Sequence, residues 1–138
     1  MGLQHMQIGE VAERTNLSLR TIRYYEEVDL VPPSARTPGG FRLYTEADVA
    51  RLMLIRRMKP LDFTLEEMRD VLEALDLLGG SEIGAARRRE LVERLDMYRD
   101  AVKARVTALR DQLESAEEFA GDLRREITRQ KRLASQDR

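Results

Sequence analysis

The side chains that could act on another molecule here are arginines and tyrosines rather than nucleophiles. The segment SLRTIRYYEE (residues 18–27) is amphipathic, because Leu19 and Ile22 fall on one face of a helix. Either Tyr25 or Glu26 joins them. Four polar side chains share the opposite face: Arg20, Thr21, Arg23 and Tyr24. Two guanidinium groups, a hydroxyl and a phenol are suited to phosphates and base edges. The alternative is a solvated surface helix with a structural tyrosine pair.

The composition excludes most catalytic and metal-binding chemistry. The sequence has no cysteine, which excludes disulfides, thiolate metal sites, iron–sulfur clusters and cysteine nucleophiles. His5 is the only histidine, so a Ser-His-Asp triad and a zinc site with several histidines are also excluded. A lone terminal histidine is a poor metal site. We therefore expect a protein that is not an enzyme and that has no cofactor.

Charge is balanced over the whole chain but not along it. The 138 residues include 24 basic and 25 acidic ones. Residues 1–60 hold nine basic and seven acidic side chains, which leaves 15 and 18 for the rest. This balance excludes a uniformly basic nucleic-acid coat but allows a local basic face. No apolar run approaches the roughly 20 residues of a membrane span, and no signal-peptide pattern is present. We expect a cytoplasmic protein without a membrane partner.

Short amphipathic helices must position the arginine face. Within RTNLS (residues 14–18), Asn16 suits a left-handed turn and Ser18 suits a helix N-cap. Thr45-x-x-Asp48 and Thr64-x-x-Glu67 repeat the cap signature. Four periodic runs mark the helices: Ile8, Val11 and Ala12; Leu19, Ile22 and Tyr25; Val49, Leu52, Met53 and Arg56; Leu65, Met68, Leu72 and Leu75.

A glycine turn beside the second helix adds further basic side chains. Arg36 and Arg42 flank the glycine turn of TPGGFRLY (residues 37–44), where the backbone can approach a phosphate closely. The alternating FRLY segment predicts one arm of a hairpin, with Phe41 and Tyr44 beside the arginines. Helix, tight turn, helix, hairpin and two helices form a winged helix-turn-helix plan. We expect this mainly α domain at residues 7–77.

A long helix follows the domain. After a glycine-rich linker at residues 78–84, apolar residues recur in steps of four and three, except where two fours meet at Val102 to Val106. This spacing predicts a coiled-coil helix at residues 85–130 with one stutter. The series is Leu91, Leu95, Tyr98, Val102, Val106, Leu109, Leu113, Ala116, Ala120, Leu123 and Ile127. Such a seam needs a partner, and we expect a homodimer. The alternatives are packing on its own N-terminal domain or on another protein.

The two ends of the chain stand outside these elements. Residues 1–6 (MGLQHM) have no apolar period and look like residues left by an expression vector, with Met6 as the expected natural start. The C-terminal stretch is basic, and we expect residues 131–138 to form a flexible tail. The alternative role for this tail is a contact with DNA or with a partner.

Taken together, these segments resemble the MerR family of bacterial transcription regulators. The matching stretches are IGEVAERTNLSLRTIRYYEE (8–27), RTPGGFRLY (36–44), TEADVARLMLIRRMK (45–59) and LDFTLEEMRDVLEAL (61–75). The resemblance continues to about Leu113. TIRYYEE followed by a GGFRLY wing is a specific combination, whereas each piece alone is a weak signal.

The resemblance implies roles for individual residues. Ser18 and Arg20 would begin the recognition helix and face bases, whereas Arg23 and Tyr24 would hold the phosphate backbone. The first wing would use Arg36, Gly40, Arg42 and Tyr44, and the turn around Lys59 would form a second, smaller wing. The sequence departs from the family at Asp29 and Asp62, where glycine is usual, and at Phe41, which lacks a tyrosine hydroxyl.

The resemblance also implies a mechanism. Two copies would join through an antiparallel coiled coil, bind a palindromic promoter spacer between the −35 and −10 elements, and distort it so that RNA polymerase can engage. The family's metal and redox sensors use cysteines, which this sequence lacks, and the chain leaves little room for a ligand domain, so its effector stays unknown. One alternative is an architectural DNA-bending protein or repressor without an effector. Another is a coiled-coil module whose N-terminal domain has lost DNA affinity.

Overall fold

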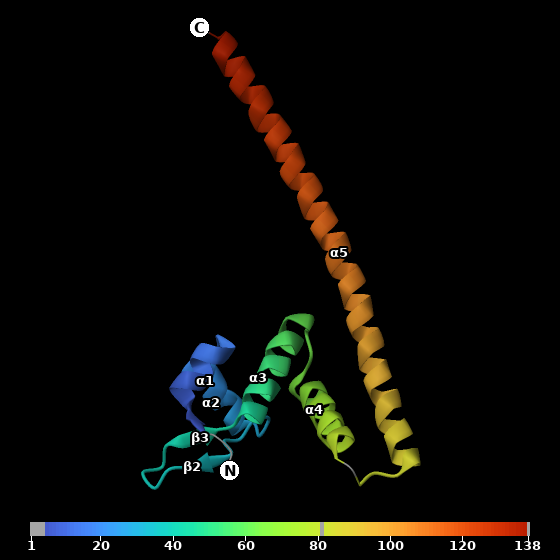
Figure 1. Ribbon diagram of the computed structural model, residues 1–138. Coiled ribbons are helices and arrows are strands. Elements are labelled where there is room, and N and C mark those ends of the chain that lie inside the picture. Colours follow the sequence, from blue (N-terminus) through green and yellow to red (C-terminus); the bar gives the residue numbers. More distant parts are fainter. Residues whose placement is uncertain (1–4, 81, 138) are drawn as a thin grey trace. The chain divides into compact units, whose positions relative to one another are not determined.

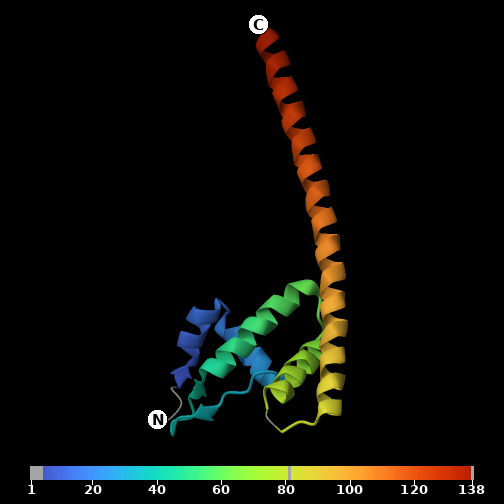
Figure 2. The same ribbon diagram turned by 45° about the vertical axis from the view of Figure 1, so that its right-hand side comes forward.

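The computed structural model describes residues 5–80 and 82–137. The expected mainly α fold with a winged helix-turn-helix and a long final helix is confirmed (Figures 1 and 2). The chain divides into a head unit, which ends at Leu95, and a distal unit, which starts at Asp96. The elements are β1 (Met6–Gln7), α1 (Ile8–Thr15), α2 (Leu19–Glu27), β2 (Ala35–Arg36), β3 (Arg42–Tyr44), α3 (Glu46–Met58), the 3-10 turn η1 (Lys59–Leu61), α4 (Leu65–Gly79) and α5 (Ala85–Gln136).

Side-chain caps begin three of the helices at the predicted positions. The Ser18 hydroxyl accepts a hydrogen bond from the Thr21 amide at 3.1 Å at the start of α2. Full capping boxes start α3 at Thr45 and α4 at Thr64. Each cap satisfies a backbone donor that the first helical turn leaves free, which stabilises the helix by about 1 kcal/mol.

Three non-glycine residues adopt left-handed backbone conformations. Asn16 ends α1 at φ 57°, Asp29 follows α2 at φ 58°, and Asp62 ends η1 at φ 64°. The prediction of a left-handed turn at Asn16 is confirmed. The two aspartates also keep the turn geometry expected at those positions, because a short polar side chain tolerates this region better than most.

A three-stranded antiparallel sheet lies at one side of the helices, in the order β1-β3-β2. The hairpin of β2 and β3 was predicted, but β1 was not, because two residues are too short to show an alternating pattern. Met6 pairs with Tyr44 and is 7% exposed within the core. Met6 is therefore part of the sheet and of the core. Residues 1–4 lie outside the described part of the chain.

The buried faces of the helices differ from the prediction in detail. In α3, Ile55 and Met58 are buried and Arg56 is exposed, because this helix packs against both α1 and α4. Leu19 and Leu75 were expected in the core, but both are exposed. Position in an ideal helix predicts a face only approximately when several neighbours contact the helix from different directions.

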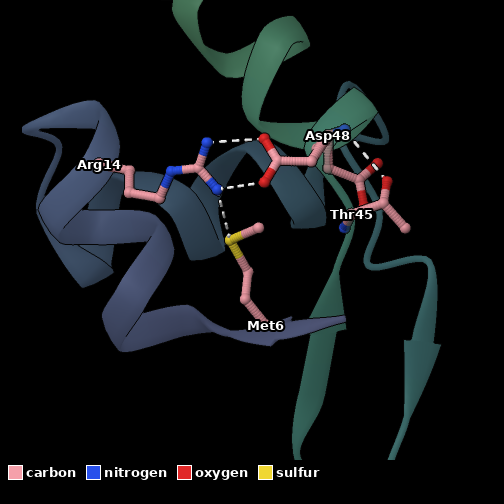
Figure 3. A network of polar contacts seen from close by, with 5 residues as sticks. Met6, Arg14, Thr45 and Asp48 are labelled. Atoms are coloured by element: carbon pink, nitrogen blue, oxygen red, sulfur yellow. Dashed lines mark hydrogen bonds and ion pairs between the residues drawn. The ribbon is translucent and has the colours of Figure 1, made fainter. Parts of the chain in front are cut away.

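Polar contacts fasten α1 to the start of α3 (Figure 3). Arg14 donates two hydrogen bonds to the Glu46 carboxylate, at 2.5 and 2.6 Å, and a third to the Met6 sulfur at 3.5 Å. Beside this pair, the buried Asp48 carboxylate accepts bonds from the Thr45 amide and from the Ser34 hydroxyl. These contacts connect β1, α1, α3 and the loop before β2. They hold α1 in place, and α1 packs against α2.

We predict that Glu46→Gln lowers the melting temperature slightly at neutral pH and has no effect in acid. Hydrogen bonds from Arg14 lower the pKa of Glu46 in the folded protein. The charged Glu46 carboxylate therefore stabilises the fold at pH values above the ordinary carboxyl pKa of about 4.3. This stabilisation is lost as the pH falls through the lowered pKa of Glu46 in the folded protein. Thermal unfolding of both proteins between pH 7 and pH 2 measures the difference. Glu13→Gln on exposed α1 surface is the control, and a difference that persists in acid would contradict this origin.

Helix α5 is longer than predicted. It runs for 52 residues to Gln136, so residues 131–136 of the expected flexible tail are helical; residue 138 lies outside the described part. Its first turns belong to the head unit, where Arg94 donates to Asp70 at 2.8 Å. Leu91 is fully buried there, which corrects its assignment to a dimer seam. The linker is also shorter, because α4 continues through Gly79.

Candidate nucleic-acid interface

Helix α2 presents the predicted polar face. Arg20 and Arg23 are exposed, and Tyr24 is 44% exposed, whereas Ile22 and Tyr25 are buried in the core. The Tyr24 ring contacts the Tyr25 ring at a centroid distance of 5.6 Å, which limits its rotation. The core residues on one face therefore fix the direction in which the arginines point.

The start of α2 is held by its own side chains. The exposed Ser18 hydroxyl donates to the Thr21 hydroxyl at 2.8 Å, in addition to capping the helix. In the preceding helix, the buried Thr15 hydroxyl donates to the Val11 carbonyl at 2.8 Å. The turn that joins the two helices therefore lies between a hydroxyl that bonds back to α1 and a hydroxyl that caps α2.

A tight loop forms the tip of the wing between β2 and β3. The Thr37 amide donates to the Phe41 carbonyl at 2.9 Å, and the Gly40 amide donates to the Thr37 carbonyl at 2.8 Å. Gly40 has φ +86°, a conformation that strains any residue with a Cβ atom. Phe41 is 66% exposed at this tip. Glycine is therefore required at position 40 for the shape of the wing.

A single carboxylate ties the wing to the recognition helix. Glu26, near the end of α2, accepts a hydrogen bond from Arg36 Nη2 at 2.6 Å and a second from Arg42 Nε. Its side chain is only 14% exposed. Arg36 also donates to the Gly40 carbonyl at 3.2 Å, which draws the loop toward the same point. Sequence reasoning missed this role, because only the pairing of β2 with β3 brings the two arginines together.

We predict that Glu26→Gln destabilises the protein by about 1–2 kcal/mol at pH 7, since two charge-assisted hydrogen bonds with limited exposure lose their acceptor charge. Chemical denaturation at a fixed protein concentration measures this change. Glu27→Gln, at the neighbouring exposed position, is the matched control and is expected to change the free energy of unfolding little. Equal losses in the two variants would mean that Glu26 does not hold the wing.

Tyr44 is a core residue, which corrects its predicted place among the DNA-contacting side chains. It is 0% exposed, and its hydroxyl has no hydrogen-bond partner among the described residues. Burial raises the pKa of Tyr44, and the nearby Glu26 carboxylate adds to the increase. The alternation of FRLY does not reveal which face of the sheet the core will cover. Tyr44 therefore supports the wing from behind.

A second basic group lies where α3 ends. Lys59 is exposed at the first position of η1, and the left-handed Asp62 closes this turn. Arg56 and Arg57 are exposed in the last turn of α3, so three cations occur within four residues. The prediction singled out Lys59 alone. The IRRMK segment also indicates that Arg56 and Arg57 are exposed, because the apolar Ile55 and Met58 on either side of them enter the core.

A model of the MerR HTH family of regulatory proteins matches residues 6–75, half of the chain. The chain belongs to the MerR family. The match covers the helix-turn-helix, the wing and most of α4, which are the elements that carry and support the basic side chains described above. The resemblance drawn from the sequence motifs is therefore confirmed.

Named relatives of this MerR chain are transcription regulators rather than enzymes, as expected. ZntR of Escherichia coli K12 is 47% identical over 66 residues, which cover 48% of this chain and 47% of ZntR. PbrR691 of Ralstonia metallidurans CH34, solved with lead(II), is 37% identical with a TM-score of 0.52, covering 87% of this chain and 86% of PbrR691. HiNmlR, a MerR regulator solved on promoter DNA, shares the fold at 21% identity and a TM-score of 0.66, with 86% and 89% covered.

The chain spans about half the length of the curated relatives that it matches. None of the helices described is both long and apolar enough to cross a membrane. Within residues 5–80 and 82–137, no three histidine or carboxylate side chains gather into a group that could hold a metal ion.

Proposed function

We propose that this MerR-family chain is a dimeric transcription regulator that binds promoter DNA. The observation that carries the proposal is the exposed face of α2, with Arg20, Arg23 and Tyr24, next to a wing whose arginines share one carboxylate. A helix of this kind fits the major groove, about 12 Å wide, while a wing follows the backbone. HiNmlR, whose crystal structure contains promoter DNA, supports the same use of the fold.

The side chains divide into two kinds of contact. Arg20 and Ser18, at the start of α2, read base edges. Arg23 and Tyr24 bind phosphates, and the cations of the two wings extend that contact along the backbone. These cations are the exposed Arg36 and Lys59 and the half-buried Arg42, and Gly40 shapes the tip of the first wing. Phosphate contacts supply affinity and register, whereas base contacts supply sequence preference. The Glu26 carboxylate positions both wing arginines for this purpose.

Two copies of the chain bind together, joined along α5. On the single chain Leu109 is 41% exposed and Leu113 is 60% exposed. Large apolar side chains exposed in a row along one helix are typical of a surface that binds a partner. The predicted seam residues Leu95, Tyr98, Val102 and Val106 continue this stripe. A two-fold dimer places its recognition helices on a palindrome. The site we propose is a promoter spacer, which the dimer distorts so that RNA polymerase can engage it, at a deformation cost of a few kcal/mol.

Footprinting on the promoter region of the chain's own gene tests this proposal. We expect protection of one palindrome within a promoter spacer, with enhanced cleavage at its centre where the duplex is deformed. Uniform protection without a defined site would instead indicate an architectural DNA-bending protein. If no duplex is bound at low ionic strength, the proposal is wrong.

A further inference from the structure

A groove lined by cations lies on the distal unit, toward the end of α5 that is red in Figure 1. Three of its arginines and a threonine occupy the i, i+3, i+4 and i+7 positions that share one side of a helix. All of the lining side chains are exposed. We name this surface the distal basic face; it consists of Arg124, Arg125, Thr128, Arg129 and Arg132.

The helix itself neutralises only part of this positive charge. The Asp122 carboxylate accepts a hydrogen bond from Arg125, and the Glu126 carboxylate accepts one from Arg129 at 3.2 Å. Both arginine side chains stay open to water, at 72% and 66% exposed. The other two arginines of the face have no ion pair within the part of the chain that the structure describes: Arg124 and Arg132.

The guanidinium groups of this face are also close to one another. A Cβ atom at Gly121 would lie 3.4 Å from Arg125 Nη1 and 3.7 Å from Arg124 Nη2, so both groups rest against the same point of the helix. Arg125 and Arg129 are four positions apart, a spacing at which like charges destabilise a helix. A helix that is only solvated gains from alternating charges, whereas clustered cations are stabilised by a bound polyanion.

The distal basic face lies opposite the apolar stripe of α5. At about 100° per residue, Leu123 and Ile127 fall on the other side of the helix from Arg125 and Arg132. A membrane that took up these apolar side chains would leave the arginines pointing away from its anionic headgroups. The face therefore fits a stiff polyanion that contacts one side of the helix and leaves the apolar stripe free.

The dimensions of the face suit a nucleic-acid duplex. Arg124 and Arg132 are eight positions apart, which is about 12 Å of helix. A duplex carries a phosphate every 3.4 Å or so along each strand, so the face spans several of them. Arginine is suited to such a partner, because its planar guanidinium donates two parallel hydrogen bonds to one phosphate.

We propose that the distal basic face binds the phosphate backbone of duplex DNA. This inference rests on the DNA binding proposed above, to which it adds a second surface that supplies affinity without sequence preference. The stretch of α5 just before the face repels phosphates and so limits the contact to the end of the helix. Its acidic residues are Asp111, Glu114, Glu117 and Glu118.

Neutralising the face tests the proposal on the full chain. The test variant carries Arg125→Gln, Arg129→Gln and Arg132→Gln. We expect it to bind a duplex of random sequence at least about tenfold more weakly in low salt, and to lower the slope of log affinity against log salt by about 2–3.

A matched control removes the same amount of charge from exposed positions elsewhere in the distal unit. It carries Arg99→Gln, Lys103→Gln and Arg110→Gln. We expect this control to change the affinity less than about twofold, because these cations are outside the phosphate contact and salt screens their effect at a distance.

A head-unit variant separates the two surfaces. Arg20→Ala with Arg23→Ala is expected to abolish sequence preference but to retain weak binding to any duplex. Adding the three glutamine substitutions of the distal basic face is expected to remove this remaining binding.

Direct contact can be measured by cross-linking, because the chain has no cysteine of its own. Thr128 lies within the groove, so we expect Thr128→Cys, labelled with a photoreactive group, to cross-link to the duplex. Gln130→Cys is two residues further along but on the opposite side of the helix, and is expected to give at least about tenfold less cross-linked DNA.

The outcomes distinguish this inference from the proposed function. Unchanged affinity and salt slope in the test variant, or equal cross-linking from the two cysteines, overturns the distal contact while binding by the head unit stands. A head-unit variant that binds as the unaltered protein does would mean that the proposed use of α2 is wrong, whatever the distal face does. Vesicles of phosphatidylcholine and phosphatidylserine provide the last arm. Vesicle binding that the test variant loses, with its DNA binding unchanged, overturns the inference in favour of a membrane contact.

Discussion

We expect Leu109→Asp to convert the proposed dimer to monomers and to weaken binding to the proposed palindrome by about 100-fold or more. A carboxylate in the apolar seam must lose its hydration in both copies, which costs several kcal/mol. Because Leu109 is 41% exposed on the single chain, the head unit and its DNA-binding face are expected to stay folded. The loss of affinity follows from the loss of bivalency, since linked modules gain a factor of roughly 10²–10⁴ through effective concentration.

Sedimentation and a gel-shift titration with an operator duplex measure these two effects. Thr107→Asp places the same charge two residues away on the opposite side of α5 and is expected to leave both mass and affinity unchanged. An unchanged dimer mass for Leu109→Asp would show that the seam lies elsewhere.

Arg20→Ala and Arg23→Ala are expected to weaken DNA binding in different ways. Loss of a base contact at Arg20 costs about 1–3 kcal/mol on the preferred sequence and relaxes the preference at one base pair. Loss of a phosphate contact at Arg23 weakens binding to all sequences alike and lowers the slope of log affinity against log salt by about 1.

Fluorescence anisotropy with variant duplexes over a salt series distinguishes the two. Arg99→Ala on the distal part of α5 serves as the control for a lost positive charge. If neither Arg20 nor Arg23 changes binding, the exposed face of α2 does not enter the groove. If both variants give the same profile, the division into base and phosphate contacts is wrong.

Local features of the fold could be predicted from the sequence. The caps at Ser18, Thr45 and Thr64 depend on residues within three positions, and the left-handed turn at Asn16 depends on its own short side chain. The glycine turn of the wing is local as well. Such features were predicted correctly because no distant part of the chain decides them.

Features that depend on distant contacts were predicted less well. Tyr44 is buried because β1 pairs with β3, and the charge of Glu26 matters because it meets arginines 10 and 16 residues away. Leu91 fits a dimer seam by spacing, yet the first turns of α5 belong to the core of the head unit. In each case tertiary packing selects between two roles that the residue type and its spacing allow equally.

The exposed leucines of the distal unit would also make the action of the proposed dimer depend on the amount of protein. With Leu109 and Leu113 open to water on the single chain, the proposed dimer would form only as the protein accumulates. Below its dissociation constant, the amount of dimer would rise with the square of total protein, so doubling expression would increase promoter occupancy up to about fourfold. In the proposed regulator, the expression level of the gene would therefore set a threshold for action.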